Sequence, residues 1–293
     1  MQQDKKEKNK KINLDIFFKE LLLFFFAIIL GMGTAFKLNN VLELQEIEVS
    51  PINLWYFILY FIVGTILILL ISFFMKSAPR KGKIFKGLFI FAIFWGGLIV
   101  LDTWLGSYFL LFGDVLSLFL ILFLIFIWIK KQSILIHNIC IVLGIAGMGA
   151  TLGLRMETET VAILLFIFAI YDFIAVYKTK HMVKMAKEMI KHKAILGIIV
   201  PKKGLGFGGE LKNVKQGGKF LVLGGGDIAF PLIFCVSLIS ENIYHSFLVF
   251  FFSLIGLFFS YFIFFKQKKQ KPIPALPPIA AFSILGYLIT FFL

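Results

Sequence analysis

Two carboxylates lie within apolar segments, where ionisable side chains are rare. Asp227 follows three glycines in the apolar run 221–231, and Asp172 follows Tyr171 in a second apolar run. The hydropathy pattern places no other acid at comparable depth. A charged side chain in the bilayer centre costs about 3 kcal/mol or more and usually faces protein or a water-filled cavity. Two neighbouring carboxylates tend to share a proton, with one acting as base and the other as acid. Such a pair can activate water for peptide hydrolysis.

The composition indicates a membrane protein. Hydrophobic residues make up 60% of the 293, with 38 phenylalanines, whereas soluble domains are nearer half apolar. The formal net charge is +14. In a polytopic membrane protein, excess Lys and Arg is explained first by orientation in the bilayer.

Apolar runs of about 17 to 25 residues predict membrane-spanning helices. Nine such runs occur, at 17–37, 54–75, 87–105, 109–129, 134–152, 160–177, 220–239, 246–265 and 274–293. We therefore expect an all-α polytopic membrane protein with nine transmembrane helices.

The distribution of charge predicts the orientation of these helices. With the N-terminus in the cytoplasm and the C-terminus outside, 28 of the 30 Lys and Arg residues fall in cytoplasmic segments, and only Lys37 and Arg155 lie outside. Eight acids fall on the outer side: Glu43, Glu46, Glu48, Asp102, Asp114, Glu157, Glu159 and Glu241. This asymmetry follows the positive-inside rule. Because the basic residues are spread over every cytoplasmic segment, we expect no nucleic-acid partner.

One long basic loop divides the chain into three predicted parts: a six-helix membrane part (1–177), the cytoplasmic loop (178–219) and a three-helix membrane part (220–293). Apolar residues at helical spacing predict an amphipathic helix over 181–190. A short strand is expected at 195–200, and residues 219–223 could supply a second strand edge.

The helix ends place the two aspartates at matching depth. Asp172 lies six residues before Lys178, and Asp227 lies eight residues after Lys219. At 1.5 Å per residue, the carboxylates are roughly 9 and 12 Å from the cytoplasmic boundary. The neighbouring glycines allow close helix approach and also weaken the helix, so local unwinding near Asp227 is expected. The alternative is that each aspartate is a separate polar contact, but matched depth favours a pair.

The segment Pro272–Pro278 contains four prolines. Because proline disfavours helix at its own position and at the one before, Ile273, Leu276 and Pro277 are predicted to lie outside a helix. The simpler alternative is a helix start with prolines. Irregular backbone at membrane depth is tolerated beside a wet cavity, where it could pair with an extended substrate.

Three motifs in this order carry a family resemblance. Tyr171-Asp172, Gly224-Gly225-Gly226-Asp227 and Pro274-Ala275-Leu276 resemble the YD, GxGD and PAL signatures of the presenilin and signal peptide peptidase family of intramembrane aspartyl proteases. The flanking residues are similar to the compact archaeal-type members. The resemblance covers the carboxy-terminal half well, whereas the first five segments match only in number and apolar character.

The resemblance implies a presenilin-like fold and the cleavage of transmembrane helices of other proteins at the cell membrane. It also implies that Asp172 and Asp227 are catalytic, that Tyr171 and the glycines belong to the active-site motifs, and that Pro274, Ala275 and Leu276 shape substrate binding. Gly225 stands where a larger apolar residue is common, so the helix is expected to be looser there. The expected partners are transmembrane substrates and the lipid bilayer, without obligate partner subunits. No cofactor is expected.

A metal site is also not expected, because the four histidines are scattered: His137 opens the fifth segment at the cytoplasmic interface, and the others lie in the loop or near the outer face. Two rival functions are weighed. A proton-coupled transporter or channel could also use two intramembrane aspartates, but the first half shows no inverted repeat. A prepilin-type GxGD peptidase usually has a basic residue after the motif and lacks PAL, so Ile228 and Pro274 argue against it.

Overall fold

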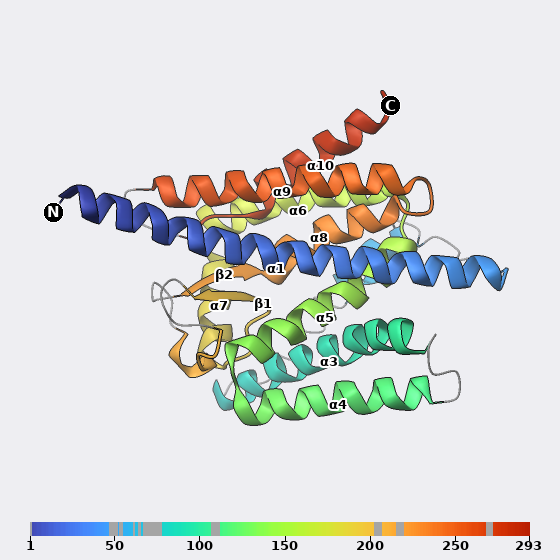
Figure 1. Cartoon of the computed structure of the whole chain (residues 1–293), viewed down its shortest axis with the longest axis horizontal. Coiled ribbons are helices and arrows are strands. Elements are labelled where there is room, and N and C mark those ends of the chain that lie inside the picture. The colour runs from blue at the N-terminus through green and yellow to red at the C-terminus, as the bar shows by residue number, and fades with distance from the viewer. Residues whose placement is uncertain are drawn as a thin grey trace.

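The computed structural model describes residues 2–46, 52, 55–60, 62–63, 66, 78–106, 112–201, 207–214, 220–267 and 272–293. Figure 1 shows a helical bundle with most helix axes near the horizontal. The helices are α1 (Gln2–Leu44), α3 (Ala78–Leu105), α4 (Gly113–Lys131), α5 (Ile134–Leu154), α6 (Thr158–Tyr177), α7 (His181–Lys191), α8 (Gly225–Ser237), α9 (Ile243–Lys266) and α10 (Leu276–Thr290), with a 3₁₀ turn η1 (Leu211–Asn213). Two strands, β1 (Gly197–Pro201) and β2 (Phe220–Gly224), form a small sheet.

Among the described residues, six helices are long and apolar enough to cross a membrane. They are Leu14–Leu44 within α1, Lys86–Leu105 within α3, and the whole of α4, α5, α6 and α9. Each overlaps a predicted span. The predicted span at 54–75 lies largely outside the described residues, and α8 and α10 are shorter apolar helices. The count of nine spans and the orientation of the termini therefore stay predictions.

The seventh predicted segment is only partly helical. Its first five residues form β2, which pairs antiparallel with β1 in the register Gly197 to Gly224 and Pro201 to Phe220. The predicted helix over 220–239 is therefore wrong at its start, and the expected strand near 195–200 is confirmed. Apolar Phe220–Leu223 suits a strand as well as a helix, and pairing with β1 decides between them.

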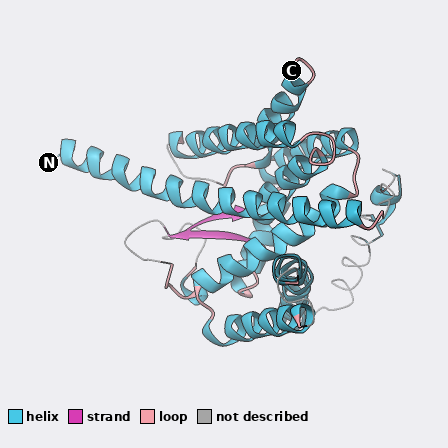
Figure 2. Ribbon diagram, turned by 45° about the vertical axis from the view of Figure 1, so that its right-hand side comes forward, coloured by secondary structure: helices cyan, strands magenta, loops and turns pink. Residues whose placement is uncertain are grey.

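The basic loop also contains the predicted amphipathic helix. It is α7, which runs across the long axis of the bundle in Figure 1. Figure 2 shows the strand pair beside α1, and β1 packs against both α1 and α5. The part of the loop that forms β1 thus packs against the helical bundle.

Helix α5 is the central element of the packing, because it contacts α1, α3 and α8. Glycines allow its close approach to α3. A Cβ on Gly96 would lie 2.7 Å from the Cα of Gly144, and one on Gly147 would lie 2.7 Å from the carbonyl carbon of Gly96. Small residues at such crossings are a common device for packing helices in membranes.

The proline-rich segment is irregular only up to Ala275. Helix α10 begins at Leu276 and has proline in its first turn, so the prediction of irregular backbone is wrong for Leu276 and Pro277, and the simpler alternative, a helix start with prolines, is confirmed there. Proline is tolerated there because the first N–H groups of a helix have no intrahelical partner. Residues 272–274 have no regular secondary structure.

Candidate active site

Helices α6 and α8 lie side by side and run in opposite directions. The Thr158 hydroxyl at the start of α6 donates to the carbonyl of Ser237, at 3.2 Å, and to Oε1 of Glu241, at 2.8 Å. The start of α6 is thereby joined to the end of α8. Residue positions along the two helices can therefore be compared by counting from this link.

One aromatic stack brings the two aspartates to the same level. Phe168 on α6 stacks on Phe230 on α8, with ring centroids 4.5 Å apart. Asp172 lies four residues beyond Phe168, and Asp227 lies three residues before Phe230. Residues at these spacings share a helix face, so both carboxylates lie one turn past the stack in the same direction. The two carboxylates interact electrostatically, and the structure thus brings together the two residues that the spacing predicted.

Each carboxylate also lies beside the backbone at the start of a helix. The N–H of Gly224, which caps α8, donates to Asp227 Oδ2 at 3.2 Å. The backbone of Leu276, the first residue of α10, lies near the Asp172 carboxylate. Asp172 is 5% exposed, and its Oδ2 has no hydrogen-bond partner among the described residues. The start of α10 therefore lies against one aspartate, as expected from the third motif, in which Pro274 is buried and Ala275 half-buried.

The three glycines of the second motif differ in their surroundings. A Cβ on Gly224 would lie 2.9 Å from Asp227 Oδ2, and one on Gly225 would lie 3.1 Å from the carbonyl oxygen of Leu196. A Cβ on Gly226 would meet only the Phe230 ring, at 3.5 Å. Gly225 is the first residue of α8 and its N–H donates to Leu196, at 2.9 Å. The unwinding expected near Asp227 is thus a strand-to-helix junction that ends before the aspartate.

Tyr171 differs from the other motif residues because its side chain is 51% exposed. It is adjacent to Asp172 on α6, whose carboxylate is buried, so the two side chains leave the helix in different directions. Tyr171 is therefore available to a lipid chain or to a substrate helix.

A further buried acid, Glu20 on α1, was not identified from the sequence. It is 5% exposed, and its Oε2 has no hydrogen-bond partner among the described residues. It interacts electrostatically with Asp227 and with Tyr261 of α9. The hydropathy pattern therefore missed one acid that packing buries. The available signal was its place directly before the apolar run that begins at Leu21.

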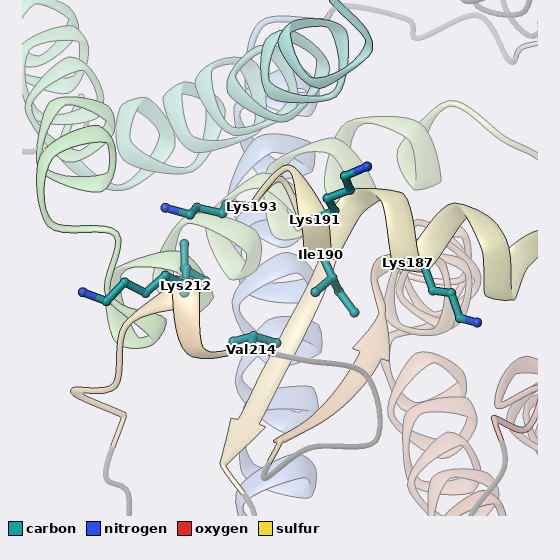
Figure 3. A pocket seen from close by; sticks show the side chains of 7 residues that line it. Lys187, Ile190, Lys191, Lys193, Lys212 and Val214 are labelled. Atoms are coloured by element: carbon teal, nitrogen blue, oxygen red, sulfur yellow. The ribbon is translucent and has the colours of Figure 1, made fainter. Parts of the chain in front are cut away.

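A basic hollow lies apart from the aspartates, between α7 and η1. It measures about 310 Å³ and is lined by Lys187, Ile190, Lys191, Lys193, Leu211, Lys212 and Val214. Figure 3 shows Lys193 and Lys212 extending to one side and Lys187 and Lys191 to the other. Lys193 donates to Gln132, at 3.0 Å, and Lys212 pairs with Glu210, at 2.5 Å. The hollow therefore does not gather its charges around one ligand. Within the described residues, no three His, Cys, Asp or Glu side chains form a candidate metal site.

Comparison with known proteins gives the family. A family model described as signal-peptide peptidase, presenilin aspartyl protease matches residues 20–293. A comparison with curated proteins gave no match. Two solved structures of a presenilin family intramembrane aspartate protease, in space groups C222 and P2, share 20% identity with this chain. Both comparisons cover 93% of this chain, with 97% and 96% of the solved chains and TM-scores of 0.64 and 0.59. The chain therefore belongs to the signal peptide peptidase and presenilin family of aspartyl proteases and is a multi-pass membrane protein with aspartic endopeptidase activity.

Proposed function

We propose that this protein hydrolyses peptide bonds within transmembrane helices of other proteins and that Asp172 and Asp227 are its catalytic pair. One observation carries the proposal. Two carboxylates from antiparallel helices lie one turn past the Phe168–Phe230 stack, in the same direction, and interact with each other. Membrane proteins rarely keep two acids at one level of a helix interface unless the acids have a use.

The proposed mechanism needs one ionised and one protonated aspartate. The ionised carboxylate takes a proton from a water molecule as the oxygen of this water attacks the scissile carbonyl carbon. The protonated carboxylic acid donates its proton to the carbonyl oxygen, which gives a tetrahedral diol. The diol then collapses and the C–N bond breaks. One diol hydroxyl gives its proton to the ionised carboxylate. The leaving amine takes the proton that the other aspartate held. The pair then again holds one proton.

The substrate is proposed to bind as an extended chain beside the sheet. A transmembrane helix satisfies its own backbone hydrogen bonds, so it must unwind before a peptide bond can be attacked. Strand β2 leads directly into α8 and Asp227, and among the described residues it is paired on one side only. An unwound substrate can pair with its other edge as an added strand. The irregular residues 272–275, which precede the Leu276 contact to Asp172, border the same site.

The topology and the need for partner subunits are also proposals, and they rest on the sequence. We propose the N-in, C-out orientation with nine spans, and activity without partner subunits. The transporter alternative is not favoured, because the family match fits a protease. It would gain support if proteoliposomes showed proton-dependent uptake that Asp172→Asn abolished while peptide cleavage was never seen.

The experiment uses purified protein in detergent and a single-span substrate, with products identified by mass. Wild-type protein is expected to cut within the span, and Asp172→Asn and Asp227→Asn are each expected to reduce cleavage at least about 1,000-fold, because a shared-proton mechanism needs both groups. A transition-state-like aspartyl protease inhibitor should block the wild type. The pH profile should have two limbs that belong to the pair. Retained cleavage in either folded variant would remove the dyad from the mechanism.

A further inference from the structure

Asn138 on α5 holds both backbone groups of one residue in β1. Its Nδ2 donates to the carbonyl of Ile199, at 2.8 Å, and its Oδ1 accepts from the Ile199 N–H, at 2.9 Å. The side chain is 1% exposed. An amide in this position makes the two hydrogen bonds that a neighbouring strand would make. A helix side chain thus takes the place of a strand at this point of the edge.

His137 adds a second attachment beside it. One ring nitrogen, Nε2, lies 3.1 Å from the carbonyl oxygen of Gly197. The other, Nδ1, accepts from the indole N–H of Trp128, at 3.4 Å, and the ring stacks on Phe89 with centroids 5.1 Å apart. Because Nδ1 accepts, the proton is on Nε2, which donates to Gly197. The ring is fully buried, so this attachment belongs to the core.

The chain after β1 returns to the same helix end. The N–H groups of Ile134 and Leu135, in the first turn of α5, donate to the carbonyls of Gly209, at 2.8 Å, and Phe207, at 2.9 Å. These donors have no partner inside the helix. The start of α5 therefore binds both β1 and the segment that follows it.

The ladder then determines which edge of the sheet is open. In an antiparallel pair, successive residues direct their backbone groups alternately toward the partner strand and away from it. Ile199 faces Asn138, so its register partner Val222 directs its N–H and C=O away from β1. Gly224, two residues on, also faces away, and its N–H reaches Asp227. The outer edge of β1 is closed by α5, and the open edge is that of β2, centred on Val222.

Helix α5 also positions α8, which carries Asp227. A Cβ on Gly149 would lie 2.5 Å from Leu232, and one on Gly153 would lie 2.5 Å from Val236. The same rigid helix therefore contacts the catalytic helix and, through Asn138, the strand pair. The distance between the open edge of β2 and the Asp227 carboxylate is fixed through this shared support.

Given the proteolytic function proposed above, we propose that Asn138 and His137 are positioning residues that set which peptide bond of the substrate is cut. They hold the sheet on α5 before substrate arrives, so a substrate strand paired with Val222 has one register relative to Asp227. A slip by one residue moves the chain by about 3.3 Å and turns every side chain to the other face. Loosening the attachment permits such slips.

The test measures where the substrate is cut. Asn138→Asp keeps the shape and the acceptor for Ile199 N–H but places an oxygen against the Ile199 carbonyl. His137→Phe keeps an aromatic ring against Phe89 and loses the bonds to both Gly197 and Trp128. For both we expect new products offset by one or two residues, at a level about tenfold above wild type, and a raised KM with a smaller change in kcat, because losing one such bond is worth about a factor of ten.

Two controls separate positioning from general damage. Asn213→Asp makes the same chemical change at an exposed site on η1. Trp104→Phe removes the 3.1 Å hydrogen bond from the indole N–H to Thr34 Oγ1, which joins α3 to α1. Trp104 lies roughly 22 Å along α3 from Phe89, which is far from the His137 site. Both controls should keep the wild-type cleavage positions, even where Trp104→Phe lowers the melting temperature. Wild-type positions in both folded site variants would overturn the proposal.

A second measurement does not depend on cleavage. Hydrogen exchange of the wild-type protein without substrate should show the Ile199 amide strongly protected, and Asn138→Asp should reduce protection across 197–200. Free exchange of this amide in the wild type would overturn the preassembled sheet. If no substrate is cut by the wild type, the proteolytic function fails, and the exchange result still decides whether Asn138 holds the sheet.

Discussion

Replacing Gly224 by alanine tests the geometry around Asp227. The backbone of Gly224 has φ −62° and ψ 144°, which alanine adopts without strain. The new Cβ would lie 2.9 Å from Asp227 Oδ2 and 3.5 Å from its Cγ. Because a carbon and an oxygen do not approach so closely without a bond, the carboxylate must move by a few tenths of an ångström. The same oxygen accepts from the Gly224 N–H, at 3.2 Å, so this hydrogen bond is strained as well.

The expected loss is in activity more than in folding. A hydrogen bond to a charged group contributes about 1.5–3 kcal/mol, and a misplacement near 1 Å can cost about 100-fold in rate. A smaller shift with a weakened bond should lower kcat/KM by roughly 10- to 100-fold, equivalent to about 1.4–2.7 kcal/mol. The melting temperature should change little, because the residue is half-buried at a helix start.

The measurement is cleavage of a single-span substrate in detergent, together with the melting temperature of each variant. Gly226→Ala is the matched comparison, because its Cβ makes only an ordinary 3.5 Å contact with Phe230 and should lose far less activity. Gly208→Ala, with nothing within 4 Å of its Cβ, is the neutral control. Full activity in folded Gly224→Ala, or a larger loss in Gly226→Ala, would refute the reasoning.

Three further predictions concern packing and burial. Gly147→Ala should lower stability by about 1–3 kcal/mol because its Cβ would overlap the backbone of Gly96, whereas Gly87→Ala, with open space around it, should not; equal melting temperatures would contradict this. Thr158→Val should cost about 1–2 kcal/mol because the hydroxyl bonds between α6 and α8 are lost, and an unchanged unfolding midpoint would count against that link. Glu20→Gln keeps the shape and replaces a buried carboxyl group that has one unpartnered oxygen, so the variant should be about as stable as wild type; a marked fall in its melting temperature would show that the carboxyl group is well paired.

Much of the site could be predicted because charges mark the ends of apolar segments. Lys178 and Lys219 fix where two segments meet the boundary, and counting from them placed Asp172 and Asp227 at one level. The structure supports that count through the stack of Phe168 on Phe230. Regular helix geometry makes such counting reliable over a few turns.

Other features depend on partners distant in the sequence. The run Phe220–Leu223 has no local signal that separates strand from helix, and β1 decides its structure. Glu20 lies directly before the apolar run that begins at Leu21, but α1 continues through it without a break, and packing against neighbouring helices buries it. Asn138 stands beside His137 at the start of an apolar run, a pair of polar residues that marks a contact without naming its partner. Only the return of the loop as β1 identifies that partner as Ile199.

The two carboxylates lie beside the same kind of group. Gly224 ends an extended segment and caps α8, and Leu276 ends an irregular segment and begins α10. At each point the backbone N–H has no helical partner, and leaving it unpaired in an apolar environment would be costly. Asp227 accepts the Gly224 N–H and Asp172 lies near the backbone of Leu276, and the positive end of a helix dipole favours a negative charge there. The breaks in helical structure that leave room for an unwound substrate therefore also place backbone groups beside both aspartates, and a regular helix through Gly224 would remove the donor that holds Asp227.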